Sequence, residues 1–344
     1  MCKVIIVGAF IGVLTQQVPE FEILLPLMQL LTKTSQYQIY GITLSSNQPL
    51  PILTPASTTT TTDIKVHLTE GNLSNSDKRV HTKGWYQKPK VDGIYYCLSL
   101  GGIKEKLDVE IAPDGKQIWI NWVNLPIAEV TAMLIGCIIG TALRLQGKIC
   151  LHSSVIKVDN CAIAIIGAKG AGKSTTAAAL AKQGYPILAD DIAVLTDCGD
   201  SFLVQPGYPR LRLWKSAVNQ LYGDEKELSR VFSQTDKHFL ELNQDKVSAW
   251  GFHNQPLPLA AIYVLGERQQ SASAPSIETI IPQMGVMQLI THRYPQSLQL
   301  ERDMFLRELA ILGRLAEIVP MRHLHRGDNL AELGKICDVI LEGE

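Results

Sequence analysis

Three groups of residues in the second half of the sequence have the types and spacing that phosphate chemistry requires. The first reads G-x-x-x-x-G-K-S and runs through Gly167, Ala168, Lys169, Gly170, Ala171, Gly172, Lys173 and Ser174, with Thr175 after it. In this pattern backbone N–H groups surround phosphate oxygens, the lysine reaches the β- and γ-phosphates, and the serine hydroxyl binds Mg²⁺. The run therefore predicts a P-loop that binds ATP and Mg²⁺.

The residues on either side favour a P-loop over a chance glycine turn. Residues 161–166 form a short apolar run that is typical of a buried parallel strand. Residues 176–183 are rich in alanine and contain no helix breaker, and Gly184 follows them as a stop signal. Strand, glycine loop and helix thus follow in the order that phosphate binding requires, with the positive end of the helix dipole at the loop.

The second group is a pair of acids, Asp190 and Asp191, which follow a short apolar strand expected at 186–189. Two carboxylates beside a P-loop could coordinate Mg²⁺ or remove the proton from an attacking hydroxyl. An acid pair can also form a solvated turn or a helix cap. Its position after the P-loop favours a role in the chemistry.

The third group is Arg210 and Arg212, which alternate with leucines in residues 209–214. On a strand, both arginines would lie on one face, where two guanidinium groups suit a phosphate or a carboxylate. The alternative is a pair of solvated arginines on an edge strand. A highly charged segment follows at 224–255, and we expect it to form a lid or to contact a substrate.

His323 and His325 form a weaker pattern. If a strand expected at 319–324 continues, both imidazoles face the same way, as in a metal-binding pair. Because no third ligand is visible in the sequence, we expect them to be ordinary structural histidines.

The composition indicates a water-soluble protein of about two domains. The chain has 344 residues, 46% of them hydrophobic, and a net charge of −1, whereas proteins that bind nucleic acid usually carry a basic excess. Its seven cysteines are scattered without a C-x-x-C pair, as expected of reduced thiols in a cytoplasmic protein. The apolar stretches 4–14 and 126–145 are too short or too polar for membrane spans. We expect neither nucleic acid nor a membrane among the partners.

Residues 1–146 predict a small α+β domain. A turn at Pro113-Asp114-Gly115 separates two strand-forming runs, 107–111 and 117–123, and so predicts a hairpin. The other elements expected here are strands at 2–7 and 93–100, helices at 21–34 and 127–146, a loop at 55–62 and an irregular stretch at 70–90.

Residues 147–344 predict an α/β domain that carries all the candidate site residues. Strands are expected at 151–158, 161–166, 186–189, 192–195, 202–206, 259–265 and 319–324, a surface loop at 267–276, and helices at 286–292, 303–317 and 330–341.

This second domain resembles the catalytic domain of HPr kinase/phosphorylase, a P-loop fold related to phosphoenolpyruvate carboxykinase. The resemblance lies in a histidine before the P-loop strand, the P-loop itself and a short strand that ends in two aspartates, all at matched spacing. Here these are Leu151-His152-Ser153-Ser154, the run Gly167 to Ser174, and Leu188-Ala189-Asp190-Asp191. The resemblance is densest over residues 150–195, and residues 1–146 do not resemble the N-terminal domain of the bacterial sugar-regulation enzyme.

The whole chain is similar to a divergent branch of HPr-kinase-like proteins with a Leu-Arg-Leu-Trp stretch, here residues 211–214. Some members of that branch phosphorylate a hydroxyl on the precursor of a modified peptide. The resemblance therefore implies an ATP- and Mg²⁺-dependent kinase whose acceptor is a hydroxyl of a peptide, a protein or a small molecule.

The resemblance also implies a role for each residue of the site. Lys173 and the P-loop backbone hold the phosphates, Ser174 and Asp191 hold Mg²⁺, and Asp190 accepts the hydroxyl proton. His152 orients the two acids by a hydrogen bond or by charge.

We place the acceptor at the mouth of the P-loop, against Arg210 and Arg212, with residues 1–146 as a further recognition surface. Three alternatives stay open: a nucleotide-binding sensor or scaffold without catalysis, an enzyme that also removes the phosphate, and a homo-oligomer.

Overall fold

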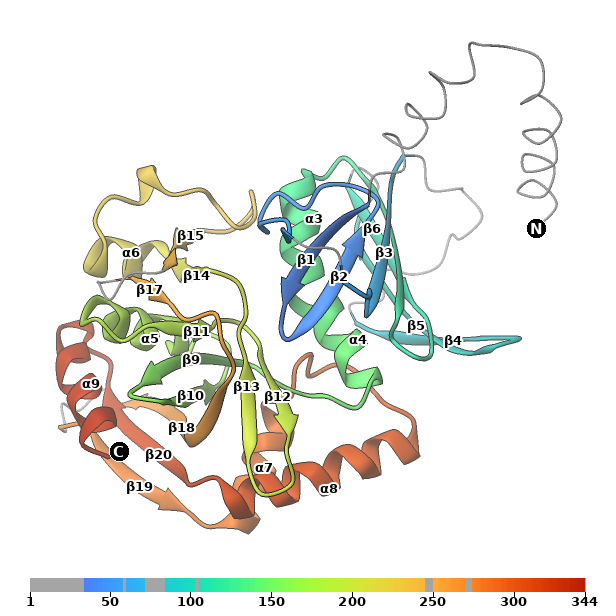
Figure 1. Cartoon of the computed structure of the whole chain (residues 1–344). Coiled ribbons are helices and arrows are strands. Elements are labelled where there is room, and N and C mark those ends of the chain that lie inside the picture. Colours follow the sequence, from blue (N-terminus) through green and yellow to red (C-terminus); the bar gives the residue numbers. More distant parts are fainter. Residues whose placement is uncertain are drawn as a thin grey trace, which may run out of the picture.

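The computed structural model describes residues 34–57, 60–71, 84–102, 105–244, 250–269 and 274–343. Within these residues the chain forms two lobes, each built on its own β-sheet (Figure 1). The strand expected at 2–7 and all but the last residue of the helix expected at 21–34 lie outside the described residues.

Seven strands form the sheet of the first lobe. They are β1 (Ser35–Ile39), β2 (Ile42–Ser46), β3 (Ile64–Glu70), β4 (Tyr86–Lys90), β5 (Gly93–Gly101), β6 (Lys106–Ile111) and β7 (Gln117–Val123). Their order is β1-β2-β3-β7-β6-β5-β4, and only β2–β3 and β3–β7 among these pairs run parallel. The expected hairpin of β6 and β7 is confirmed. The expected irregular stretch at 70–90 is wrong at its end, where β4 forms an exposed edge strand beside β5.

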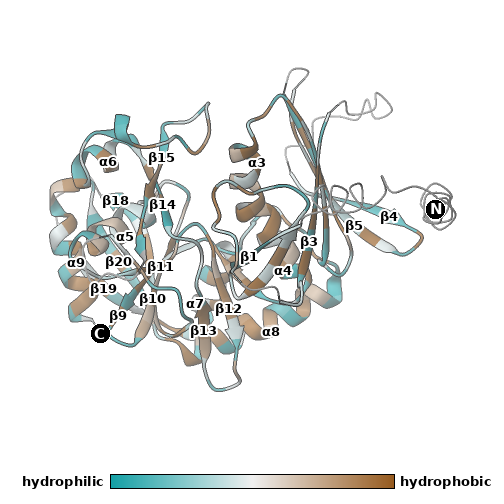
Figure 2. Ribbon diagram, turned by 45° about the horizontal axis from the view of Figure 1, so that its top comes forward, coloured by the Kyte–Doolittle hydropathy of each residue, from teal (hydrophilic) through white to brown (hydrophobic). Residues whose placement is uncertain are grey.

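A helical stretch at 127–145 covers one face of this sheet on the side of the second lobe, and it is mostly hydrophobic (Figure 2). It consists of α3 (Ile127–Met133), a π-helical turn η1 (Leu134–Ile138) and α4 (Ile139–Leu145). The stretch is long and apolar enough to cross a membrane, but 72% of it is buried inside the protein. The expected buried helix is therefore present. The sequence did not predict its break at Gly136, whose φ and ψ are −99° and −118°.

The second lobe contains a larger, mixed sheet. Its strands are β8 (Ile149–Leu151), β9 (Ser153–Val158), β10 (Cys161–Gly167), β11 (Ile187–Ala189), β12 (Ala193–Asp197), β13 (Phe202–Gln205), β16 (Asn243–Gln244), β17 (Gly251–Phe252), β18 (Leu257–Gln269), β19 (Ser276–Ile280) and β20 (Met321–Gly327). The order is β16-β17-β11-β9-β10-β18-β13-β12-β8, with β20 beside β18 and β19 beside β20. The predicted P-loop strand, β10, is parallel to β18 but antiparallel to β9, so the expectation of a parallel strand is met on one side.

Helices lie on both faces of this sheet (Figure 1). They are α5 (Lys173–Lys182), α6 (Lys215–Leu221), α7 (Pro282–Thr291), α8 (Arg302–Ile318) and α9 (Leu333–Glu342). Alternate residues of β10 enter two cores: Ile163 packs in the cluster of α5 and α9, whereas Ile166 packs in that of α7 and α8. The result is a mixed α/β protein whose central strand is buried from both sides.

In the segment 224–255, the described residues 224–244 and 250–255 include regular structure, and the expectation that the segment forms a lid or contacts a substrate stays a prediction. It holds the short 3₁₀ turn η2 (Glu225–Glu227) and β15 (Lys237–Glu241), which pairs with β14 (Arg210–Trp214) in a separate two-stranded sheet. The expected loop at 267–276 is shorter than predicted, because β18 runs to Gln269 and β19 begins at Ser276.

Several sets of contacts join the lobes, among them two at buried sites. At one, the backbone N–H of Tyr40 donates to the carbonyl of Pro206 at 2.8 Å, and the Tyr40 hydroxyl donates to the carbonyl of Ile135 at 3.1 Å. At the other, the buried guanidinium of Arg144 donates two bonds to Glu308 of α8, at 2.7 and 2.9 Å. The second contact explains why an arginine interrupts so apolar a helix: its charge is compensated across the interface.

Candidate active site at the glycine loop

The glycine loop, residues 167–174, joins the end of β10 to the start of α5 at Lys173. Gly170 and Gly172 have φ values of +83° and +104°, in the left-handed region that glycine enters without steric cost. The expected order of strand, loop and helix is therefore observed. The helix begins at Lys173, three residues before its expected start at 176.

Lys173 is 6% exposed and lies back on its own loop. Its ammonium group donates to the carbonyls of Gly167 at 2.9 Å and Ala168 at 3.1 Å. Burial lowers the pKa of Lys173 to about 8, although Asp190 and Asp191 act to raise it. With a pKa of about 8, the side chain is still mostly protonated at pH 7. It is therefore a cation beside a loop that has the pattern for phosphate binding.

Asp190 is buried beneath the loop, where both of its carboxylate oxygens accept hydrogen bonds from protein groups. Its Oδ1 accepts hydrogen bonds from the hydroxyls of Ser154 at 2.6 Å and Ser174 at 2.8 Å. Its Oδ2 accepts from the backbone N–H of Arg212 at 2.9 Å. Asp190 is 1% exposed, so it is placed to position Ser174 and is shielded from an incoming hydroxyl.

Asp191 is the acid that faces the pocket. Its φ is +73°, a strained value for a residue other than glycine. Its Oδ2 accepts a bond from Arg212 at 3.0 Å and one from the Tyr294 hydroxyl at 3.4 Å. Burial acts to raise the pKa of Asp191, but the charge of Arg212, followed by that of His152, more than offsets it and lowers the pKa. The carboxyl is therefore ionised at neutral pH.

His152 lies beside this acid. Its Nδ1 is 3.0 Å from the backbone carbonyl of Asp191, and because a carbonyl only accepts, this nitrogen carries the proton. The ring stacks on Tyr294 with centroids 5.2 Å apart. Burial lowers the pKa of His152, with Asp191 acting against it. A neutral imidazole of this tautomer has its lone pair on Nε2.

Arg212 is occupied by protein groups. Its Nε donates to the Tyr208 hydroxyl at 2.8 Å, its Nη1 to Asp191, and its Nη2 to the carbonyl of Ala132 at 2.9 Å. With 7% exposure, it positions Asp191 and has little to offer an acceptor. Arg210 is bound to Glu241 at 2.9 Å and is absent from the lining of the pocket as the described residues define it.

The first lobe contributes part of this site, which the sequence did not indicate. The backbone at Ala132 binds Arg212, and the π-helical turn brings Gly136 against the acid. A Cβ added to Gly136 would lie 3.4 Å from Asp191 Oδ2 and 3.6 Å from Arg212 Nη1. π-helical turns occur often at functional sites. The available signal in the sequence was Gly136 itself, a glycine inside an otherwise apolar helical run.

Two further arginines lie against the glycine loop. The guanidinium of Arg268 donates to the carbonyl of Gly170 at 3.3 Å and binds Asp328 at 2.8 Å. Arg326 donates to the carbonyl of Ala171, and its buried Nε has no hydrogen-bond partner among the described residues. Burial, followed by the charge of Arg268, lowers the pKa of Arg326 to about 10. Arg326 is thus a poorly compensated cation beside the loop.

One pocket of about 110 Å³ gathers most of the predicted residues. Its lining includes His152, Lys169, Gly170, Gly172, Lys173, Ser174, Thr175, Asp191 and Arg212. Lys237, from the charged segment, and Trp214 complete the side away from the loop. A larger hollow of about 780 Å³ lies on the first lobe, over β4 to β7, and its lining residues include none of the predicted site residues.

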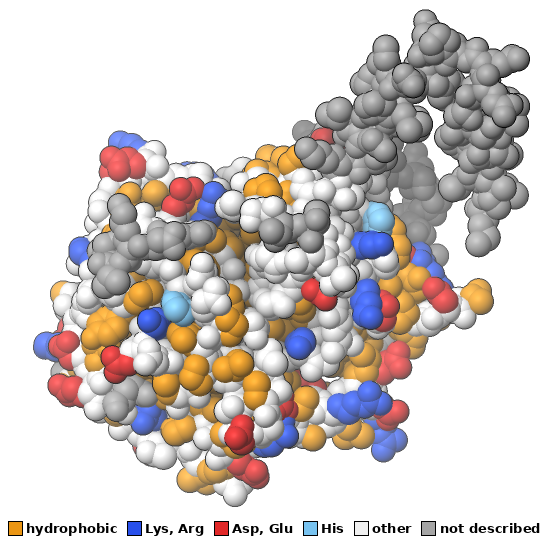
Figure 3. Space-filling view, in the orientation of Figure 1, with side chains coloured by type: hydrophobic (Ala, Val, Ile, Leu, Met, Phe, Trp, Pro, Cys, Tyr) orange, Lys and Arg blue, Asp and Glu red, His pale blue; other side chains and the backbone are white. Residues whose placement is uncertain are grey.

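Surface charge is mixed on the face shown in Figure 3. Lysine and arginine side chains are scattered there among acidic, hydrophobic and other side chains, without a broad patch of one sign. The expectation that no nucleic acid binds stays a prediction.

Comparisons with known proteins give a distant likeness of fold. No family model matches the sequence, and no curated protein matches it significantly. Among solved structures, the chain is similar to the Hpr(Ser) kinase/phosphatase from Coxiella burnetii, with 11% sequence identity and a TM-score of 0.31, over 56% of this chain and 95% of that chain. A likeness of this degree assigns neither an activity nor a substrate.

Proposed function

We propose that this protein is an ATP- and Mg²⁺-dependent kinase that transfers the γ-phosphate to a hydroxyl of a peptide, a protein or a small molecule. The observation that carries the proposal is that the two adjacent acids beside the glycine loop have different surroundings. Asp190 binds the loop serine at 2.8 Å, whereas Asp191 faces the pocket. One carboxylate at the loop hydroxyl and another in the open site is what phosphoryl transfer to an alcohol requires.

The metal ion would be held on the Asp190 side. The Ser174 hydroxyl and the Asp190 carboxylate lie together at the start of α5, and both are oxygen donors of the kind that Mg²⁺ prefers. Bound there, the ion would neutralise charge on the β- and γ-phosphates. This exchanges the roles expected from the sequence, in which Asp191 held the metal ion and Asp190 was the base.

Asp191 would act as the base. It takes the proton of the acceptor hydroxyl as the hydroxyl oxygen bonds to the γ-phosphorus, and the bond from that phosphorus to the β-phosphate oxygen breaks to release ADP. Arg212 and the backbone-bound His152 fix the position of the carboxylate. Lys173, which leaves the two loop carbonyls when phosphates arrive, would balance their charge.

The acceptor would enter beside Lys237 and Trp214. Lys237 lines the pocket and lies over the Trp214 ring, 5.4 Å from its centroid, without an ion pair among the described residues. It replaces Arg210 and Arg212 as the cation we propose for a charged group on the acceptor.

A matched pair of variants tests the proposal. The protein is incubated with ATP, Mg²⁺ and a panel of hydroxyl-bearing peptides, amino acids and sugars, and phosphate transfer is followed by mass spectrometry. Asp191→Asn should bind ATP normally and lower transfer by about 10²- to 10⁴-fold. Asp190→Asn should also weaken Mg²⁺-ATP binding, and the exposed Asp200→Asn serves as the control. Full transfer by Asp191→Asn would refute the assignment of the base.

A nucleotide sensor without transfer is the second candidate. It is favoured by the bond from Arg212 to the carbonyl of Ala132, which connects the acid in the pocket to the helix of the first lobe. Normal ATP affinity, no phosphorylated product with any acceptor, and a nucleotide-dependent change in hydrogen exchange of residues 127–145 would favour the sensor.

A further inference from the structure

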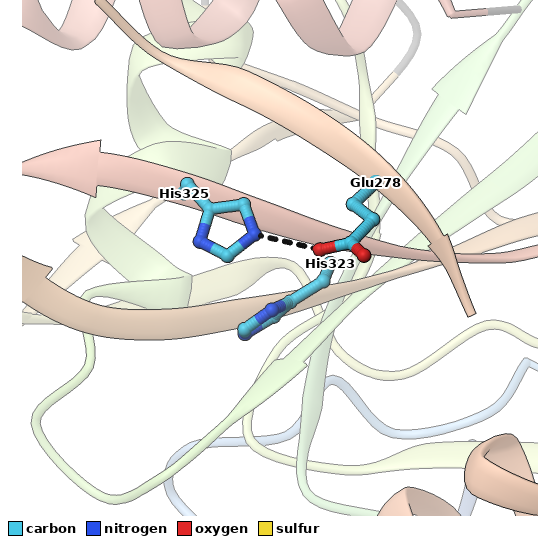
Figure 4. A group of neighbouring side chains, drawn as sticks. All are labelled: Glu278, His323 and His325. Atoms are coloured by element: carbon cyan, nitrogen blue, oxygen red, sulfur yellow. Dashed lines mark hydrogen bonds and ion pairs between the residues drawn. The ribbon is translucent and has the colours of Figure 1, made fainter. Parts of the chain in front are cut away.

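Three ligating side chains meet on the outer strands of the second lobe (Figure 4). Glu278 lies on β19, and His323 and His325 lie on β20. Each offers one ligand atom, and these atoms all lie within 4.8 Å of one another. The sequence indicated the two histidines but no third ligand. Glu278 on β19 is a candidate for the third ligand that the sequence did not reveal.

The backbone explains this arrangement. β19 and β20 pair antiparallel, with Glu278 opposite His323 and Ser276 opposite His325. Residues two apart on a strand point to the same side of the sheet, so His323 and His325 share the face that Glu278 also occupies. Three donors on one rigid ladder are held in place by main-chain pairing and do not depend on a loop.

The side chains are close together but able to adjust. His325 Nε2 lies 3.3 Å from Glu278 Oε2, and the side chains of these residues are 33% and 74% exposed. The two imidazole centroids are 4.4 Å apart. On the neighbouring strand, a Cβ at Gly266 would lie 2.8 Å from His323 Nε2, so glycine at this position makes room for the imidazole.

We propose that Glu278, His323 and His325 bind one divalent transition-metal ion of the Zn²⁺ type. Zinc ligands lie about 2.0–2.2 Å from the ion, which places ligand atoms about 3.5 Å apart in a tetrahedral site, so modest side-chain rotations close the set. Two imidazoles and a carboxylate suit Zn²⁺, Cu²⁺ or Ni²⁺, whereas Mg²⁺ prefers oxygen ligands only. The remaining position is open to water. This site is separate from the one proposed at Ser174 and does not depend on the proposed kinase function.

Metal binding would fasten β19 to β20. The residue after His325 is Arg326, which points to the opposite side of the strand and binds the glycine loop. An ion bound by His325 on one face of β20 would therefore lie next to Arg326, which contacts the glycine loop from the opposite face of the strand. The direct consequence is stabilisation of the folded protein, because the ion binds the folded strand pair and has no preformed site in the unfolded chain.

Zn²⁺ itself is the probe for this site. The full chain, free of any affinity tag and of nucleotide, is titrated with Zn²⁺ in competition with a chromophoric chelator, and thermal unfolding is followed in parallel. We expect one ion bound at this site and a rise in the unfolding temperature with Zn²⁺ concentration. His323→Ala, His325→Ala and the nearly isosteric Glu278→Gln should each weaken binding about tenfold or more, whereas His67→Gln and Glu317→Gln should leave it unchanged.

Two results would overturn the proposal. One is no binding at a Zn²⁺ concentration well above that of the protein. The other is unchanged affinity in all three ligand variants, which would place any bound ion elsewhere. Circular dichroism shows whether each variant is folded, and Co²⁺ gives an independent readout. The wild type should develop the visible absorption of tetrahedral Co²⁺, Glu278→Gln should lose most of it, and absorption equal in the two would also refute the site.

Discussion

The two sides of the candidate active site are built in opposite ways. The glycine loop is one run of consecutive residues whose geometry depends on main-chain conformation, with glycines in the left-handed region at Gly170 and Gly172. The acid–arginine side is assembled from separate segments, so that Asp191 meets Arg212 and Tyr294 only in the folded chain. On the loop side, Arg326 is a cation that the described residues compensate poorly, whereas Asp191 and Arg212 on the acid side already bind each other. Under the proposed function, the loop side would receive the phosphates and the acid side would hold the Asp191 carboxylate in position.

Arg212→Ala should give the largest effect and would break the acid side. It removes the partner of Asp191 and leaves the Tyr208 hydroxyl and the Ala132 carbonyl without their donor. Removing one member of a buried ion pair costs about 3–5 kcal/mol of folding free energy, measurable by urea unfolding. Arg210→Ala is the matched control, because its exposed pair with Glu241 is worth about 0–1 kcal/mol. Equal losses in the two variants would contradict the comparison.

Arg326→Ala should act on the loop side. The partly unsatisfied guanidinium beside Ala171 gains a partner when a phosphate binds. We expect the free energy of nucleotide binding to weaken by about 1.5–3 kcal/mol, the usual contribution of a charged hydrogen bond. The contacts of Asp191 with Arg212 and Tyr294 should not change. Calorimetric titration with ATP measures this, and Arg322→Ala on the same strand is the control. An unchanged affinity would remove Arg326 from the nucleotide site.

Gly136→Ala tests whether the first lobe supports the acid. Gly136 lies inside the π-helical turn, and an alanine there would place its Cβ 3.6 Å from Arg212 Nη1, which sets an apolar group against a buried ion pair. The new methyl group would also contact Asp191 Oδ2. We expect lower stability and slower phosphate transfer with unchanged ATP affinity, whereas Gly313→Ala, with open space around its Cβ position, should be neutral. A loss of ATP affinity alone would place Gly136 on the loop side instead.

The smallest effect is a pH dependence that belongs to the loop side. Lys173 is protonated below its pKa of about 8, and a triphosphate binds the protonated form more tightly. Nucleotide affinity should therefore fall as the pH rises above 8, by at most about tenfold per pH unit, or 1.4 kcal/mol. Titrations on both sides of pH 8 measure it. Lys173→Arg keeps its charge and should bind with little pH dependence, so an equal fall in that variant would assign the titration to another group.

The local half of the site could be predicted from the sequence. The glycine loop, the helix after it and the acid pair each depend on neighbouring residues, so their pattern is visible in one short run. Alternation along β14 also placed Arg210 and Arg212 on one face, and both guanidinium groups lie near the Phe239 ring.

The rest depended on long-range contacts. Nothing in the alternation reveals that Arg212 is buried against Ala132, 80 positions earlier. The roles that we propose for Asp190 and Asp191 rest on which carboxylate meets Ser174. Both acids lie beyond the end of β11 at Ala189, and Asp191 has a φ of +73°, so a strand pattern could not tell which carboxylate would face the loop serine. Glu278 was missed for the same reason, because its partners on β20 lie more than 40 positions away.

The wide turn at residues 134–138 also sets the register of the helix that contains it. An α-helix advances about 100° per residue, so a π-helical turn, which holds an extra residue, rotates everything after it by about that angle. Ala132, before the turn, directs its carbonyl at Arg212, and Arg144, after it, meets Glu308 at 2.7 Å. Deleting one residue from the turn would swing Arg144 away from Glu308 while leaving Ala132 in place. The wide turn thus lets one helical stretch make two contacts with the second lobe. Before the turn it binds Arg212, the partner of the pocket acid, and after the turn it binds Glu308.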